Sequence, residues 1–151
     1  MQLFSARDLA TTVCRHWQAT LPSGFVTAWP GTEVGTATLS EWFELWVDAW
    51  QPRPQRAISP ARWDVAVTVH CYVRPQLDAG RVQELAELAR AALANRLLSV
   101  RTTNAGPLLG HLQLLEPELV DLSRKELERR KSALRHAMLR CRGVAQQSNV
   151  E

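Results

Sequence analysis

The clearest alternation of apolar and polar side chains along the chain runs through residues 62–74. The odd positions from Trp63 to Val73 are apolar, and most of the even positions from Arg62 to Arg74 are polar. Successive side chains of an extended strand point to opposite faces. The pattern therefore predicts a long strand that is buried on its odd face, and Pro75 ends it.

A second alternation runs through residues 42–50. One face of this predicted strand is an ordinary apolar stripe that begins at Phe43 and Leu45. The other, which we call the tryptophan–acid face, consists of Trp42, Glu44, Trp46, Asp48 and Trp50. Three exposed indoles exceed what a monomer usually tolerates, and tryptophan is enriched at the energetic centres of interfaces. Two interpretations of these tryptophans carry equal weight. Either the chain itself buries them, through residues 31–40 or through the late basic segment (residues 124–142), or another subunit does.

Helical spacing predicts two helices. Ser5 and Asp8 form a capping box for the first, which ends near Thr20. Asp78 is the expected N-cap of the second, whose apolar stripe is Val82, Leu85, Leu88, Ala89, Ala92, Leu93 and Leu97. Shorter strands are predicted at residues 25–29, 98–102, 109–115 and 134–141, with residues 118–122 continuing the preceding strand. Residues 123–131 fit either a short helix or a polar hairpin tip.

These elements predict one α+β domain over residues 1–151, with residues 145–151 as a frayed polar tail. The expected fold is an antiparallel or mixed β-sheet sandwich, with the N-terminal helix and the central helix packed on the sheet. A core of this kind is expected to include Phe43, Leu45, Val65, Val67, Val69, Leu85, Leu88 and Leu93.

Composition narrows the function classes. The chain is 46% hydrophobic and 22% charged, which is typical of a globular protein, and its net charge is only +3. No apolar run reaches the roughly 18 residues that span a bilayer. The opening residues lack the order of a signal peptide, so we expect the chain in the cytoplasm. We expect Arg129, Arg130 and Arg135, in the late basic segment, to pair with Glu44 and Asp48 of a neighbouring subunit.

No spacing of chemical groups indicates catalysis or a cofactor. Cys14 with His16, and His70 with Cys71, contain ligand types but lack the spacing of a structural zinc site. Three widely spaced cysteines do not form a disulfide framework, and each lies in an apolar context, so we expect buried thiols. The sequence predicts no enzyme, no metal site and no cofactor.

The order of elements resembles that of tail-terminator (tail-completion) proteins of long-tailed bacteriophages. The resemblance consists of an opening helix, a pair of strands, a long strand ending at Arg74-Pro75, a helix of the form Leu-Ala-Glu-Leu-Ala-Arg-Ala-Ala-Leu at residues 85–93, and closing strands at residues 110–115 and 134–141. The family implies a structural protein of the virion, assembled in the host cytoplasm. Such proteins form homo-oligomeric rings, typically hexamers, that cap the tail tube and contact neck or connector proteins. DNA passes through the lumen only as cargo, and no membrane is involved.

Two other interpretations stay open. One is a head–tail joining protein of the neck in the same particle. The other is a small α+β nucleic-acid-binding module, with the tryptophans as stacking platforms and the late arginines as phosphate contacts. Glu44 and Asp48 argue against this second one, because they place negative charge between the indoles.

Overall fold

The computed structural model describes residues 4–29, 32, 35–52, 62–75, 77–78, 80–124 and 134–148. Among these residues the order of elements agrees with the predicted order. The elements are α1 (Ala6–Thr20), β1 (Thr27–Ala28), a 3-10 turn η1 (Thr36–Thr38), β2 (Glu41–Trp50), β3 (Arg62–Val73), α2 (Arg81–Leu93), β4 (Leu97–Arg101), β5 (Leu108–Leu114), β6 (Glu118–Asp121) and β7 (Arg135–Gln147).

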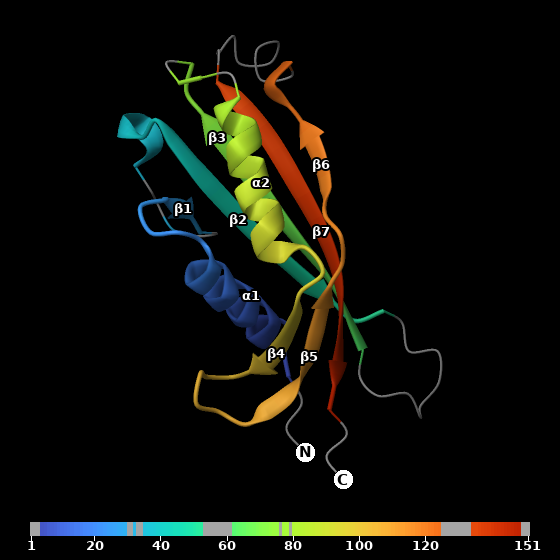
Figure 1. Cartoon of the computed structure of the whole chain (residues 1–151). Coiled ribbons are helices and arrows are strands. Elements are labelled where there is room, and N and C mark those ends of the chain that lie inside the picture. Colours follow the sequence, from blue (N-terminus) through green and yellow to red (C-terminus); the bar gives the residue numbers. More distant parts are fainter. Residues whose placement is uncertain are drawn as a thin grey trace.

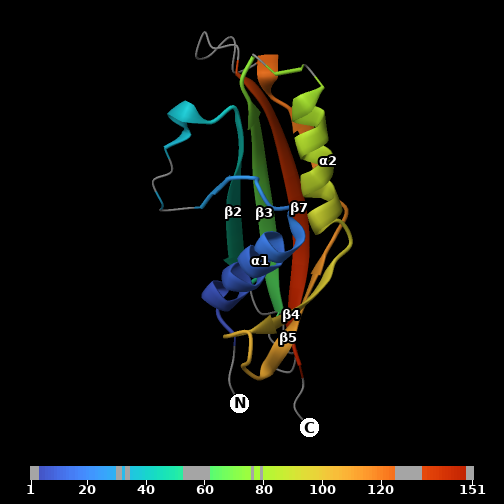
Figure 2. The same ribbon diagram turned by 60° about the vertical axis from the view of Figure 1, so that its left-hand side comes forward.

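The strands form one curled sheet, and both helices lie on the same side of it (Figures 1 and 2). The strand order is β1-β2-β3-β7-β5-β4, and β6 pairs with β7 beside β5. Among the described strands, β1 and β2 run parallel and the other pairs are antiparallel. The α+β class and the packing of both helices on a mixed sheet are confirmed, whereas the curled sheet does not confirm the sandwich arrangement. The long strand β7 pairs with β3, β5 and β6, so the described strands join one sheet and its inner face packs on helices.

The core lies between the inner face of the sheet and the two helices. The odd positions of β3 from Val65 to Val73 are buried, as the alternation predicted. They stand in register with Phe43 and Leu45 of β2 and with Leu139 of β7. From the helices, Trp17 and Leu85 are fully buried against this face. The expected core residues are confirmed, with Leu88 only partly buried.

The helix starts agree with the sequence prediction in one case only. The capping box of α1 is confirmed, since Ser5 Oγ accepts from Asp8 N at 3.3 Å and Ser5 N donates to Asp8 Oδ2 at 2.7 Å. The prediction of Asp78 as the cap of α2 is wrong. Its carboxylate accepts from Gly80 N at 2.6 Å, forming a local turn, and the helix begins afterwards. Leu97, assigned to the helix stripe, starts β4 instead.

The last strand is longer than expected. Residues 145–147 belong to β7 rather than to a frayed tail, because Gly143–Gln147 pairs with Gly110–Leu114 of β5. Ala145 and Gln147 are buried by this pairing. Residues 149–151 lie outside the described residues, as do residues 125–131, where a helix and a hairpin tip were both considered.

Candidate interaction surface

The outer face of the sheet, which is the side turned away from α1 and α2, carries the tryptophan–acid face in register with side chains of other strands. Trp50 of β2 lies beside Asp64 of β3, which lies beside Val144 of β7. The same row continues through Gln113 of β5 to Leu97 of β4. The outer face is therefore one surface that extends over several strands.

Exposed apolar side chains concentrate on this face. Trp46 is 43% exposed and Trp50 is 45% exposed on β2. Leu97 on β4 is 63% exposed. Val120 on β6, which pairs with Met138 of β7, is 39% exposed. These side chains are separated by polar ones, since Asp48 lies between the two tryptophans and Asp64 and Gln113 stand in the row from Trp50 to Leu97. Large exposed apolar side chains rimmed by polar residues are typical of surfaces that another molecule covers.

Trp42 differs from the other two tryptophans because its own chain buries it. It is only 7% exposed. Its ring stacks on Tyr72 with centroids 5.1 Å apart, and the Arg74 guanidinium lies 5.3 Å from its centre. Arg74 is held in place by hydrogen bonds to Leu39 O and Thr36 O. The chain itself therefore buries Trp42, whereas Trp46 and Trp50 are exposed and available to a partner.

Acidic groups on β2 orient and flank the exposed indoles. Glu44 Oε1 accepts a hydrogen bond from Trp46 Nε1 at 2.7 Å, which restrains that ring. Asp48 is exposed between Trp46 and Trp50. An indole that is already restrained loses less conformational entropy when a partner covers it.

The arginines predicted to pair with these carboxylates are not brought to them within one chain. Arg129 and Arg130 lie outside the described residues. Arg135 stands opposite Val73, on the inner side of the sheet, and its Nη1 is buried without a hydrogen-bond partner. Their pairing with Glu44 and Asp48 of another subunit stays a prediction.

Two other arginines of the late basic segment, which the sequence analysis did not choose as partners of these carboxylates, do share the outer face. Arg140 stands in the same row as Trp46, through Thr68, and Arg142 stands in the row of Asp48. Both are exposed. Their alternation with buried Leu139 and Cys141 was visible in the sequence, but only the strand order places them opposite the tryptophan strand. The face is therefore acidic toward β2 and basic along β7.

The outer face also holds a compact ring cluster. His70 Nδ1 and His136 Nε2 lie 2.7 Å apart, and His136 stacks on Tyr72 with centroids 4.3 Å apart. Neighbouring Cys71 faces the core, where burial raises its thiol pKa to about 12, so it is not an activated nucleophile. Among the described residues no three histidine, cysteine or acidic side chains are grouped as metal ligands would be. The three rings of His70, Tyr72 and His136 pack on one another at this point of the outer face.

Comparison with known proteins gives structural likenesses but no sequence match. No family model matches the sequence, and no curated protein matches it. The chain is similar to the sheath/tube terminator of an extracellular contractile injection system, PVC, in its extended state. The identity is 11% and the TM-score is 0.49, over 99% of this chain and 59% of that one. The chain thus spans less than two thirds of that protein. No described helix has the length and apolar character of a membrane span.

Proposed function

We propose that this chain is a non-enzymatic structural subunit that assembles into a ring in a phage-tail-like particle, in the role of a tail terminator on the tube. The observation that carries the proposal is the outer face, with exposed Trp46, Trp50, Leu97 and Val120 on strands of one sheet. The order of elements that resembles tail terminators is also present in the fold. A neck protein of the same particle is the nearest alternative.

The open edge of β2 supports assembly as well. Phe43 N donates to Val26 O, so the odd residues of β2 turn their backbone groups away from β3. The strand β1 is in register only with Phe43 and Glu44. The backbone groups of Val47 and Ala49 therefore meet no strand within the described part of the chain. Unpaired edges of this kind are templates for strands of other chains.

Light scattering on the purified protein tests the proposal. Over a concentration series at low and moderate salt, we expect either a discrete ring-sized mass or a mass that increases with protein concentration toward that of a ring. Trp46→Ala should keep the fold but lower this mass to that of a monomer. Leu119→Ala is the matched control, because Leu119 is equally exposed at 43% but pairs with Leu139 on the inner side of the sheet. A wild-type protein that stays monomeric throughout would contradict the proposal.

A nucleic-acid-binding role is the second candidate, favoured by the exposed Arg140 and Arg142 on the face that carries Trp46. It predicts that single-stranded DNA binds with an affinity that falls steeply with salt. Glu44 and Asp48, beside the same indole, oppose a phosphate backbone. Fluorescence anisotropy with labelled single-stranded DNA at low salt distinguishes the two roles. Binding that Trp46→Ala abolishes, in a protein that stays monomeric, would favour the module.

A further inference from the structure

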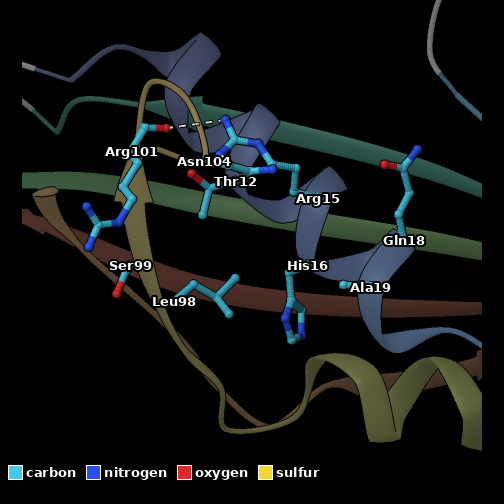
Figure 3. Close-up of a pocket in the computed structure, with 9 residues that line it drawn as sticks. All are labelled: Thr12, Arg15, His16, Gln18, Ala19, Leu98, Ser99, Arg101 and Asn104. Atoms are coloured by element: carbon cyan, nitrogen blue, oxygen red, sulfur yellow. Dashed lines mark hydrogen bonds between the residues drawn. The ribbon is translucent and has the colours of Figure 1, made fainter. Parts of the chain in front are cut away.

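A groove between α1 and β4 has no role in the surface described so far. Its volume is about 560 Å³, within the range of roughly 300–1,000 Å³ typical of ligand pockets. Figure 3 shows α1 on one side and β4 on the other. The residues that matter for its chemistry are Arg15, His16, Ala19, Leu98, Ser99 and Arg101.

The groove carries positive charge that no carboxylate offsets. Arg15 donates to Asn104 Oδ1 at 3.0 Å and to Thr102 O at 3.1 Å, and Arg101 donates to Gly106 O at 2.7 Å. These acceptors are neutral, and neither arginine has an ion-pair partner among the described residues. Figure 3 places the two guanidinium groups on either side of β4. Cations held in this way favour an acidic partner.

The groove also borders a strand edge with which no strand of the described part of the chain pairs. Arg96 O accepts a hydrogen bond from Leu114 N, so the backbone groups of Arg96 face β5. Along an antiparallel strand, the backbone groups of successive residues point alternately to one neighbour and to the other. The backbone groups of Ser99 therefore point away from β5, toward the groove. Arg101 O, on the same side, accepts from Arg15 Nη2. The groove thus combines a strand edge, fixed cations and an apolar wall at Leu98.

We propose that the β2 corner of one copy, formed by Trp46, Asp48 and Trp50, docks in this groove on the next copy. The inference rests on the proposed ring and names its two surfaces. The strand β2 contains acidic residues and no basic one, so its charge is complementary to that of the groove. Its open edge at Val47 and Ala49 matches the open edge at Ser99.

The side chains of the β2 corner are chemically complementary to those of the groove. Asp48 supplies the carboxylate that the groove arginines lack. The exposed indole of Trp50 would lie over the guanidinium of Arg15, because arginine binds favourably over the face of tryptophan. The corner and the groove are different parts of the chain, so the contact is heterologous. A heterologous contact builds a closed ring when its rotation closes.

Disulfide trapping tests the contact. In a Cys14→Ser background, which removes the half-buried thiol of α1, the double variant Asp48→Cys/Ser99→Cys should give a ladder of linked species on a non-reducing gel. Either single cysteine should leave the protein at the monomer band. The control Asp48→Cys/Val120→Cys pairs the corner with an exposed apolar site on β6 and should also stay at the monomer band. All replaced side chains except Cys14 are exposed, and circular dichroism verifies the fold of each variant.

The outcomes separate this contact from the ring itself. Because Asp48→Cys itself removes the attracting carboxylate, the gel is run at a protein concentration at which light scattering still finds the double variant assembled. If Asp48→Cys/Ser99→Cys assembles there and gives no ladder, the contact is wrong and the ring stands. If the protein is monomeric and unlinked, both fail. A ladder from the Val120 control instead would place the corner against β6. Asp48→Asn should weaken association by about tenfold or more, as loss of a buried charge pair does; an unchanged association constant would overturn the contact.

Discussion

Two tryptophans of the same strand and the same face should respond differently to removal. Trp→Ala in a packed site costs about 3–5 kcal/mol. Trp42 is 7% exposed, between Tyr72 and the Arg74 guanidinium. Because the Arg74 side of the site is partly exposed to solvent, we expect the lower end, about 3 kcal/mol. Trp46 is 43% exposed, and its replacement should cost less than about 1 kcal/mol in the monomer.

Thermal melting followed by circular dichroism measures the difference. For a chain of this length each kcal/mol lowers the midpoint by about 2–4 °C. Trp42→Ala should therefore melt about 6–12 °C below the wild type, and Trp46→Ala no more than about 4 °C below it. The measurement belongs at a protein concentration where light scattering finds monomers, since assembly adds its own stability. Equal shifts for the two variants would refute the assignment of Trp42 to internal packing.

Predictions at three further residues, Gly110, Ser5 and Cys71, test the fold. Gly110→Ala should destabilise it by about 2–3 kcal/mol in urea unfolding, because a Cβ would lie 2.3 Å from Gln146 O. Ser5→Ala should cost about 1 kcal/mol by the same assay and Ser5→Gly only a few tenths. Burial raises the thiol pKa of Cys71 from 9.0 to about 12, so iodoacetamide at pH 8 should label half-buried Cys14 first, as mass spectrometry would show. Because the thiol pKa of Cys71 is higher in the folded state, its contribution to stability is complete below pH 9.0 and is lost as the pH rises toward 12. Thermal melting midpoints that stay constant over this pH range would contradict the burial of this thiol.

The long strands could be predicted because their signals are local. Along β3 every second side chain from Val65 to Val73 is buried, and pairing on both edges keeps that alternation unbroken. A one-residue slip would move the whole apolar set to the outer face. The start of α1 could be predicted for the same reason, since Ser5 and Asp8 complete their hydrogen bonds within one helical turn.

The features that the sequence could not give depend on contacts between distant segments. Trp42 and Trp46 have the same parity in β2, and contacts with Tyr72 and with Arg74, which the carbonyl of Leu39 holds, distinguish Trp42. The end of β7 resembles a polar tail until β5 pairs with it. Leu97 and Val120 join the outer face only through the strand order, which no local pattern encodes.

The charge of β2 explains why its open edge need not pair with itself. Natural edge strands are commonly protected by lysine, proline or a bulge, and residues 46–50 contain neither lysine nor proline. They do contain Asp48, exposed beside Trp46 and Trp50. Two such edges brought together would oppose like charges, which is destabilising across strands. Against a groove fixed by Arg15 and Arg101 the same carboxylate is attractive. One acidic residue would then disfavour the symmetric dimer and favour the heterologous contact that a ring needs.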